Sequence, residues 1–498
     1  MATVLHQHQH HHHDEKEHFD IHEDARTEDT EMMAEEERTE EVVPPEEAEQ
    51  QQYHHHHHQD PQRQHQQQQT PEEEDEEQED LAEETSEDEA VDSGVQADMD
   101  KLTSDFPGFR NRYRLIKRIG EGTFSTVYKA MDIMYDHYDN SWDLEDDTSK
   151  WSPPPLKRKG SNVSHQSPPR RKARYVAIKK IYVTSSPSRI LNELELLHDL
   201  RQCPSVCPLI TAFRNTDQVV AILPYFRHGD FRAYFRDMTI QDIAIYLRSL
   251  FTALKSVHEH KILHRDIKPT NFLYDPSSQR GVLVDFGLAE REGSDTKPCL
   301  CHEARETRKH RQANSSWAQN SANPQPGYPK SDTRSSRRAN RAGTRGFRAP
   351  EVLFKCTEQT TSIDIWSAGV ILLTIMSKRF PFFNSADDVE AMIEIATIFG
   401  TKRMKAAGLL HGCVFDTSIP TVGQQGFSME KIILWSTCRT DDKPLAPDEK
   451  LAVRFLERCM ELDPTRRITA EQALEHEFLK VEKPTSQEPT YEDDFVVY

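Results

Sequence analysis

The sequence lacks the features that mark membrane and secreted proteins. No stretch approaches about 18 uninterrupted apolar residues, so we expect no transmembrane helix and no membrane partner. The first ten residues, MATVLHQHQH, contain no apolar stretch of the kind that a signal peptide requires. Only 8 of the 498 residues are cysteines, and they are scattered along the chain. This spacing favours reduced thiols over a disulfide framework.

The first hundred residues have too few apolar side chains to form a core. They hold 34 Asp+Glu and 4 Lys+Arg, a net charge of −30, whereas the whole chain carries −22, so residues 101–498 carry +8. Histidine runs (10–13 and 54–58) and a glutamine run (66–69) make this part low in complexity. We predict a disordered acidic tail over residues 1–109. The histidine runs could chelate a metal, although a solvated tail is the simpler interpretation.

The folded part is predicted to begin near residue 110 with strands. Apolar and polar residues alternate at 113–119, 127–130 and 175–181, as they do in half-buried strands. A helix is predicted to start at Ser186-Pro187, because proline suits the first helical position and leucines recur on one face after it.

Helices dominate the rest of the folded part. One is predicted after Thr239, which with Asp242 resembles a capping box, and residues 363–376 are apolar almost all round, as in a buried core helix. A final helical pair is predicted near 447–460 and 470–478. Strands followed by helices indicate an α+β fold, with a small, mainly antiparallel β lobe carrying one main helix and a larger helical lobe.

Polar segments divide this domain, which we place at residues 110–480. Two long inserts, about 135–173 and 292–341, are rich in Pro, Ser, Asn and Arg and show no periodicity. Residues 481–498 form an acidic and aromatic C-terminal tail, which either docks on the protein or frays.

A glycine-rich motif lies between the first two predicted strands. It reads Gly120-Glu-Gly122-Thr-Phe-Ser125-Thr-Val127, with serine at the third glycine position of G-x-G-x-x-G. Glycines there let backbone N–H groups approach phosphate oxygens. The position between strands disfavours a dinucleotide site, but the motif alone is also compatible with a plain hairpin turn.

A lysine and a glutamate form the second candidate pair. Lys179 lies in the apolar strand Val176-Ala-Ile-Lys179, where an unpaired ammonium would be costly to bury. Glu193, on the inner face of the next predicted helix, is the expected protein partner, and ATP phosphates would be the other. An ordinary lysine at a strand edge is the alternative.

The third pattern specifies phosphoryl transfer. His264-Arg-Asp266-Ile-Lys268-Pro-Thr-Asn271 is followed by Asp285-Phe-Gly287. Phosphoryl transfer needs positioning and charge neutralisation more than covalent help. We predict that Asp266 orients the attacking hydroxyl and that Lys268 stabilises the transferring group. Asn271 and Asp285 supply the oxygen ligands that Mg²⁺ prefers.

Together these motifs resemble the eukaryotic protein kinase superfamily over residues 110–480, which implies the bilobal kinase fold, ATP and Mg²⁺. The resemblance also implies that Asp364 braces the catalytic loop and that Glu351 of Ala-Pro-Glu351 pairs with Arg467. It further implies an adenine site with Leu223 as gatekeeper in front of the hinge Pro224-Tyr-Phe226. The ATP-binding residues predicted in this way are Ile119, Gly120, Gly122, Ser125, Val127, Ala177, Lys179, Leu223, Tyr225 and Leu273.

Within the superfamily the chain is most similar to the cell-division-cycle-seven kinases, the catalytic subunits of the DDK complex. The features are the glycine loop with serine, proline in the hinge, the second insert, Leu409-Leu-His-Gly-Cys413 and, above all, Arg341-Ala-Gly-Thr344-Arg-Gly-Phe-Arg348-Ala-Pro-Glu. This implies an activating regulatory subunit of the DDK type, MCM helicase subunits as substrates and a role in replication initiation. The family has proline where this chain has Arg345, and the first insert is longer than the family needs.

The family's preference for an acidic or phosphorylated residue after the target hydroxyl implies a basic clamp. Arg341 and Arg348 flank Gly343-Thr344 and could hold that anion, or one of them could only brace the segment. The open alternatives for the whole chain are an acid-directed or cell-cycle kinase of another group and a pseudokinase scaffold. The second fits poorly, because Lys179, Asp266 and Asp285 are all present.

Weaker signals concern a metal and the nucleus. Cys299 and Cys301, with His302 and His310 nearby, have ligand types that suit Zn²⁺, and a disordered cysteine pair is the alternative. The basic clusters at 156–159 and 170–174 resemble a split nuclear-localisation signal or form a solvated loop. We expect no direct nucleic-acid contact, because no aromatics interleave with the basic residues.

Overall fold

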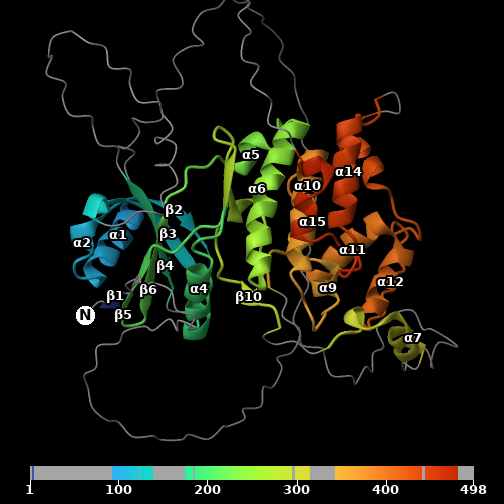
Figure 1. Ribbon diagram of the computed structural model, residues 1–498, viewed down its shortest axis with the longest axis horizontal. Helices are drawn as coiled ribbons and strands as arrows, with labels where there is room; N and C mark the ends of the chain where they lie inside the picture. The colour runs from blue at the N-terminus through green and yellow to red at the C-terminus, as the bar shows by residue number, and fades with distance from the viewer. Residues whose placement is uncertain are drawn as a thin grey trace, which may run out of the picture. The chain divides into compact units, whose positions relative to one another are not determined.

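The computed structural model describes residues 3–4, 92–122, 124–137, 174–182, 185–293, 298–313, 342–439 and 443–480 (Figure 1). Residues 23–98 form one compact unit, of which only 92–98 are described, and residues 1–22 with 99–498 form the other. The sheet, the candidate site and the described helical residues from 99 onward belong to the second unit.

A six-stranded sheet makes the small lobe, in the order β1-β5-β6-β4-β3-β2. The described strands are β1 (Thr3–Val4), β2 (Tyr113–Glu121), β3 (Ser125–Asp132), β4 (Tyr175–Ile181), β5 (Thr211–Asn215) and β6 (Gln218–Pro224). Strand β3 alternates strictly between half-buried and buried residues, as a sheet with one packed face requires. The three strands predicted from the sequence are confirmed as β2, β3 and β4.

The register of the sheet gathers the predicted nucleotide residues on one face. Val127 of β3 lies opposite Lys179 of β4, and Ala177 lies opposite Leu223 of β6. Directly opposed residues of antiparallel strands share a face, and so do residues two apart on one strand. These four side chains therefore lie on the same side of the sheet.

One main helix packs on the small lobe, as predicted. Helix α4 (Pro187–Asp199) has proline in its first turn, after Ser186 at the N-cap. It buries Ile190, Leu194 and Leu197, but it also buries Glu193 on the same side. A buried carboxylate requires a charged or hydrogen-bonding partner, and Lys179 provides it.

The folded part begins earlier than the predicted boundary at residue 110. Helix α1 (Ser93–Asp105) and the short α2 (Phe109–Arg112) precede β2, and Met99 and Leu102 are buried. Asn215 donates a hydrogen bond to the carbonyl oxygen of Asp105, and Gln218 donates to its carboxylate at 3.1 Å. These contacts join the end of α1 to the β5–β6 hairpin. The sparse apolar residues of this stretch gave too little periodicity to reveal the helix.

The large lobe is helical (green to red in Figure 1). Its described helices are α5 (Phe231–Tyr234), α6 (Ile240–Glu259), α7 (Arg305–Ala313), α9 (Pro350–Leu353), α10 (Ser362–Ser377), α11 (Asp388–Phe399), α12 (Thr401–Leu410), α13 (Met429–Ser436), α14 (Pro447–Cys459) and α15 (Ala470–Leu474). The predicted capping box of Thr239 and Asp242 opens α6. Fifteen of the sixteen residues of α10 are buried, which confirms the predicted core helix.

Short strands and turns carry the chemistry at the junction of the lobes. Strand β7 (Ile262–Leu263) pairs with β10 (Glu290–Arg291), and β8 (Phe272–Asp275) pairs with β9 (Arg280–Leu283). The loop between β7 and β8 holds the His264–Asn271 motif, and the loop after β9 holds Asp285. The predicted two-lobed α+β architecture is thus confirmed.

The inserts are only partly described. Residues 138–173 and 314–341 lie outside the described residues, as do most of the N-terminal tail and the tail after residue 480. In the second insert the structure shows a 3₁₀ turn at Leu300–His302 and then α7, where the sequence indicated no regular element. Among the described helices, none combines the length and the apolar composition needed to cross a membrane.

Candidate active site

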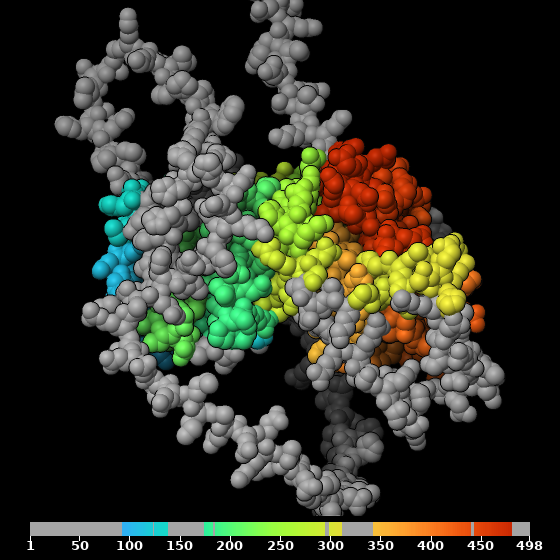
Figure 2. All heavy atoms as spheres, turned by 60° about the horizontal axis from the view of Figure 1, so that its bottom comes forward, coloured from blue at the N-terminus to red at the C-terminus, as the bar shows by residue number. Residues whose placement is uncertain are grey.

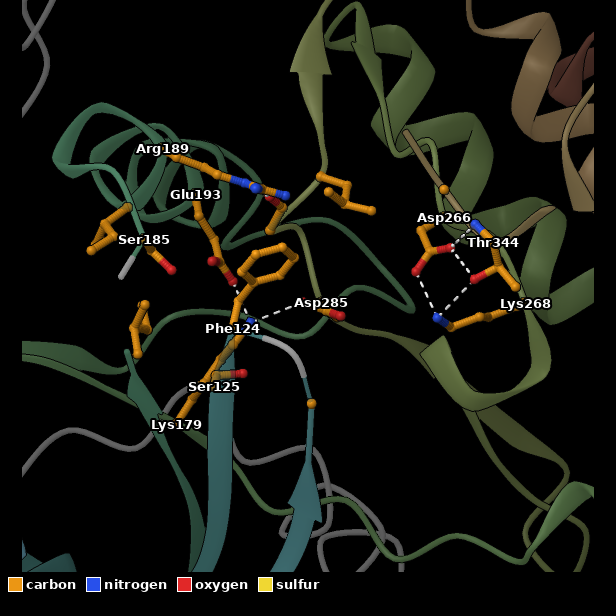
Figure 3. Close-up of a pocket in the computed structure, with 16 residues that line it drawn as sticks. Phe124, Ser125, Lys179, Ser185, Arg189, Glu193, Asp266, Lys268, Asp285 and Thr344 are labelled. Atoms are coloured by element: carbon orange, nitrogen blue, oxygen red, sulfur yellow. Dashed lines mark hydrogen bonds and ion pairs between the residues drawn. The ribbon is translucent and has the colours of Figure 1, made fainter. Parts of the chain in front are cut away.

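A cavity of about 340 Å³ lies between the sheet, α4 and the catalytic loop (Figure 3). Seven of its lining residues were predicted from the motifs: Gly122, Ser125, Lys179, Glu193, Asp266, Lys268 and Asp285. Phe124 of the glycine-rich loop and Arg189 of α4 also line it, and the Arg189 guanidinium lies 4.4 Å from the centre of the Phe124 ring. Segments far apart in the sequence thus meet around one space.

Lys179 is held between two carboxylates. Its Nζ lies 2.6 Å from Oε1 of Glu193 and 2.9 Å from Oδ1 of Asp285, which confirms the predicted pair with Glu193. Burial alone would lower the pKa of Lys179, but the two carboxylates raise it above its usual value. The ammonium therefore stays charged, and it points from strand β4 into the cavity (Figure 3).

Asp285 combines ionisation with exposure. Burial would raise the pKa of its carboxyl, but the Lys179 ammonium and its hydrogen bond lower the pKa to about 2. The side chain remains 48% exposed, whereas that of Lys179 is 9% exposed. Its φ of +66° lies in the left-handed region, which is costly for a residue other than glycine and occurs often at functional sites. A carboxylate that is ionised at neutral pH therefore faces the cavity.

Asp266 lies at the centre of a second hydrogen-bond network (Figure 3). Its Oδ1 accepts from the backbone N–H of Thr344 at 2.9 Å and from the Thr344 hydroxyl at 2.8 Å. Its Oδ2 lies 2.7 Å from Nζ of Lys268 and accepts from Asn271 at 3.0 Å. Burial would raise the pKa of this carboxyl, but Lys268 and Thr344 lower it overall. Asp266 is thus an ionised, fixed acceptor.

Glycine is required beside this network. Gly343 has a φ of +93°, and a Cβ there would overlap the carbonyl oxygen of Arg265. The backbone of the segment before α9 can therefore lie directly on the catalytic loop. This close approach places the N–H and hydroxyl of Thr344 on Asp266, a role that the sequence motif did not reveal.

A buried carboxylate holds the catalytic loop, the His264–Asn271 stretch between β7 and β8. Asp364 is fully buried and accepts from the backbone N–H groups of His264 and Arg265 at 2.9 and 2.8 Å, and it contacts His258 at 3.0 Å. Burial would raise the pKa of Asp364, but the hydrogen bond and charge of His258 lower it. The predicted bracing role of Asp364 is confirmed, and His258 is an additional partner.

The loop also carries an ion pair that sequence reasoning missed. Arg265 has φ +70° and a side chain only 3% exposed, and its Nη1 lies 2.7 Å from Oε1 of Glu290 on β10. Burial lowers the pKa of Arg265, and Glu290 opposes that shift. Two residues 25 positions apart offer no local sequence signal for such a pair. It fixes β10, the first element after the Asp285 motif, to the catalytic loop.

The charges and oxygen ligands of this cavity fit a nucleoside triphosphate with Mg²⁺. Lys179 offers a charge for phosphate oxygens, and Asp285 offers an ionised oxygen ligand. Both hydrogen bonds of Asn271 to Asp266 use its amide nitrogen, which leaves the amide oxygen for a cation. When bound, Mg²⁺ would be held by Asp285 and the amide oxygen of Asn271, and it would neutralise charge that develops during phosphoryl transfer.

The predicted adenine residues lie beyond this cavity. Ile119, Val127, Ala177, Leu223, Tyr225 and Leu273 are not among its lining residues, although all are at least partly exposed. The register given above puts Val127, Ala177 and Leu223 on the face that carries Lys179. The cavity therefore corresponds to the phosphate end of the site, and the adenine roles remain predictions.

The comparisons with known proteins agree with this geometry. Residues 162–314 and 327–479, more than half of the chain, match the protein kinase domain family. The chain is 48% identical over 390 residues to the cell cycle serine/threonine-protein kinase hsk1 of Schizosaccharomyces pombe, covering 77% of this chain and 75% of that one. The chain belongs to the cell-division-cycle-seven family of serine/threonine protein kinases.

Two further relatives show how widely the family extends. The cell cycle protein kinase spo4 of Schizosaccharomyces pombe is 39% identical over 396 residues, covering 78% of this chain and 90% of that one. The human cell division cycle 7-related protein kinase is 26% identical over 569 residues, covering 78% and 93%. As a protein kinase, this cell-division-cycle-seven family member uses ATP and Mg²⁺.

The stretch from Asp285 to Glu351 is the activation segment of the kinase, and it ends at a buried ion pair. Nη1 and Nη2 of Arg467 lie 2.6 and 2.9 Å from the two carboxylate oxygens of Glu351, and both side chains are at most 2% exposed. The pair predicted from the family resemblance is therefore confirmed. It anchors α9 to the segment that precedes α15.

The structure describes only one of the two arginines that were predicted to bind the substrate anion. Arg341 lies outside the described residues. Arg348 donates to the carbonyl oxygen of Gly343 at 2.7 and 2.9 Å and lies 2.6 Å from Asp388, the first residue of α11. These are the contacts expected of a bracing residue, and anion binding stays a prediction for both arginines.

The predicted cysteine pair lies elsewhere in the kinase. Cys299 and Cys301 are 1% and 2% exposed and do not line the cavity. His302 and His310, the nearby histidines considered as ligands, are exposed. The pair is therefore ordered and buried, contrary to the disordered alternative. The two histidines near it in sequence, His302 and His310, are not buried with it.

Proposed function

We propose that this kinase phosphorylates serine and threonine in acidic contexts, with MCM helicase subunits as substrates, and so triggers the initiation of DNA replication. The observation that carries the proposal is the 48% identity to a cell cycle serine/threonine kinase across three quarters of both chains. The mildly basic charge of residues 101–498 supports an acidic substrate as well.

Arg341 and Arg348 are the residues we propose for acidic selectivity. Gly343 and Thr344 line the cavity next to Asp266, so we propose that the residue that follows the target hydroxyl lies beside this segment. A hydrogen bond to a charged group contributes about 1.5–3 kcal/mol. This corresponds to roughly tenfold or greater discrimination at about 1.4 kcal/mol per decade.

The acid-selectivity test separates binding from bracing. Phosphorylation of matched peptides with Asp or Ala after the target serine is measured for the double variant Arg341→Ala, Arg348→Ala. We expect the ratio of the two rates to fall toward one. Asp388→Asn is the control, because it breaks the same brace but keeps the arginine. An unchanged ratio in the double variant, or an equal fall in Asp388→Asn, would refute the clamp.

We also propose an activating regulatory subunit that stabilises the position of α4. The Lys179–Glu193 pair is the element that such a subunit would act on, because it depends on where α4 lies against the sheet. Comparing the lone chain with the co-purified complex on MCM subunits tests this. Full activity of the lone chain would refute the requirement for a regulatory subunit, and no activity of either form on MCM subunits would refute them as substrates.

Nuclear localisation is the remaining part of the proposal. The basic clusters at 156–159 and 170–174 support it by composition alone. Alanine substitution of both clusters in a fluorescently tagged chain should shift the protein out of the nucleus. Unchanged nuclear fluorescence would remove the localisation role from these clusters.

A further inference from the structure

One arginine of helix α4 contacts two different walls of the cavity. The guanidinium of Arg189 lies 4.4 Å from the centre of the Phe124 ring, at the tip of the glycine-rich loop. Its Nε donates to the carbonyl oxygen of Gly287 at 2.8 Å. All three residues line the cavity, and Figure 3 shows the Arg189 side chain extending from α4 toward the Phe124 ring. We refer to these two contacts as the Arg189 bridge.

On one side, the Arg189 bridge holds the glycine-rich loop. The N–H of Gly122 donates to the carbonyl oxygen of Ser125 at 2.9 Å, and the N–H of Tyr182 donates to the carbonyl oxygen of Phe124 at 2.9 Å. These bonds fix the backbone of the loop, but Phe124 remains 44% exposed. A cation over the face of an aromatic ring is attracted to it. Arg189 therefore gives an exposed ring a preferred position at the edge of the cavity.

On the other side, the Arg189 bridge holds the residues that follow Asp285. The carbonyl oxygen of Gly287 accepts from Arg189, while the N–H of Gly287 donates to the Asp285 carboxylate. A Cβ on Gly287 would lie 3.3 Å from oxygens of both Asp285 and Glu193, so this glycine lies directly against the two carboxylates. A shift of Gly287 would therefore move the carboxylate that is assigned to Mg²⁺.

Helix α4 holds this stretch at two points, and one of them is in the cavity. Asn192 donates to the carbonyl oxygen of Ala289 at 2.9 Å. Residues three apart on a helix lie on the same face, so Arg189 and Asn192 both extend toward the stretch after Asp285. Of these two residues, only Arg189 lines the cavity. Figure 2 shows the blue-green surface of α4 directly beside the yellow-green surface of the large lobe.

We propose that Arg189 is a positioning residue for phosphoryl transfer, which couples the glycine-rich loop to Asp285. Arginine suits this role, because its Nε donates in the plane of the guanidinium while the face of the same group stacks on an aromatic ring. The residue acts through Phe124 and Gly287 and not on the reacting atoms. A displacement of α4 would break both contacts together, so the position of this helix sets two walls of the cavity at once.

Two ligands that share adenosine but differ in phosphate separate positioning from a general loss of structure. Binding of a non-hydrolysable ATP analogue with Mg²⁺, and of adenosine, is measured by calorimetry on the full chain and on Arg189→Ala. We expect affinity for the analogue to fall by about threefold to tenfold, the size of a partly desolvated cation–π contact, and affinity for adenosine to stay within about twofold.

Two single substitutions separate the halves of the Arg189 bridge in steady-state phosphorylation. Arg189→Lys keeps a cation near the ring but lacks the Nε donor, so it should lower kcat more than it raises KM for ATP. Phe124→Leu keeps an apolar tip but lacks the ring, so it should mainly raise KM for ATP. Because Phe124 is 44% exposed, this second variant should fold even if Arg189→Ala does not.

The double variant Arg189→Ala, Phe124→Leu tests the coupling itself. It should raise KM for ATP no further than Arg189→Ala alone, because residues in contact do not contribute additively. The matched control is Arg201→Ala, which should keep wild-type values, because Arg201 also donates to a backbone carbonyl, that of His198 at 3.0 Å, but does not line the cavity. Additive losses, equal losses of affinity for adenosine and the analogue, or wild-type kinetics in both Arg189→Ala and Phe124→Leu would each overturn the proposal.

Discussion

The cavity and the group formed by Cys299, Cys301, Cys356 and His411 are built in opposite ways. In the cavity, charged groups are balanced by each other, and although Lys179 is only 9% exposed, its partner Asp285 stays 48% exposed. In the second group, all four side chains are buried and lie side by side. The first arrangement keeps a charged group available for a substrate that enters and leaves, whereas the second offers almost no surface to solvent.

The same contrast separates reaction from support elsewhere in the kinase. Around the position of phosphoryl transfer, the side chains of Lys268 and Asp285 keep 26% and 48% of their surface exposed, whereas the fully buried Glu351–Arg467 pair holds the end of the activation segment. We therefore expect substitutions in the cavity to change the rate and substitutions at buried pairs to change stability. The predictions below run from the largest expected effect to the smallest.

Asp266→Asn should give the largest loss of rate. The amide cannot accept a proton or hold Lys268 by charge, and positioned acid–base groups contribute about 10²–10⁴-fold. We expect kcat to fall by at least about 100-fold with little change in KM for ATP. Steady-state kinetics on an acidic peptide measure this. Asp237→Asn, on the surface, is the control, and a loss of similar size there would point to a folding defect.

Arg467→Ala should instead act on stability. It leaves the Glu351 carboxylate buried without its partner, which costs about 3–5 kcal/mol for a buried pair. Urea unfolding of the purified chain measures the change. The adjacent Arg466→Ala is a matched control, because Arg466 is 72% exposed and lies 4.0 Å from Glu461. Equal effects in the two variants would contradict the distinction between buried and exposed pairs.

Glu290→Gln tests whether the arginine of the catalytic loop depends on its neighbour. Arg265 is 3% exposed, and the amide would replace the ion pair by a hydrogen bond from the charged guanidinium to an uncharged acceptor. We expect kcat to fall by roughly fivefold to thirtyfold, because loss of the acceptor's charge weakens the contact by about 1–2 kcal/mol. Glu292→Gln, two residues on, should keep the wild-type rate. Wild-type kcat in Glu290→Gln would show that the pair is dispensable.

The smallest effect concerns pH. The pKa of Asp285 is lowered from 3.8 to about 2, so its contribution to stability is fully present above about 3.8 and is lost as the pH falls through about 2. Lys179, with a raised pKa, stays charged throughout. ATP affinity should therefore be flat between pH 6 and pH 8, apart from titration of the nucleotide itself. A step in this range that Asp285→Asn removes would contradict the assigned ionisation.

The fold and the cavity could be predicted where the information is local. Thr239 with Asp242 and Pro187 after Ser186 mark helix starts within four residues, and the His264–Asn271 and Asp285 motifs keep fixed short spacings. The Lys179–Glu193 pair follows from one strand and the helix after it. In each case hydrogen bonding or burial of neighbouring residues dictates the pattern.

The rest could not be predicted because its partners are distant in sequence. Cys301 and Cys356 are 55 residues apart, and Cys299 and His411 are 112 apart. The cysteine pair suggested a metal, but only the packing of α9, α12 and the insert shows that Cys356 and His411 lie beside the pair. Helix α1 was missed for a different reason, since its few apolar residues follow a strongly acidic stretch.

One side-by-side measurement tests most directly whether the cavity performs the reaction and the buried Glu351–Arg467 pair supports the fold. Steady-state phosphorylation and urea unfolding are measured for Asp285→Asn and Arg467→Ala in the purified chain. We predict that Asp285→Asn loses phosphoryl transfer but unfolds like the wild type, whereas Arg467→Ala loses stability but keeps KM for ATP within about twofold, because its folded molecules retain an intact cavity. Wild-type turnover in Asp285→Asn would contradict the account.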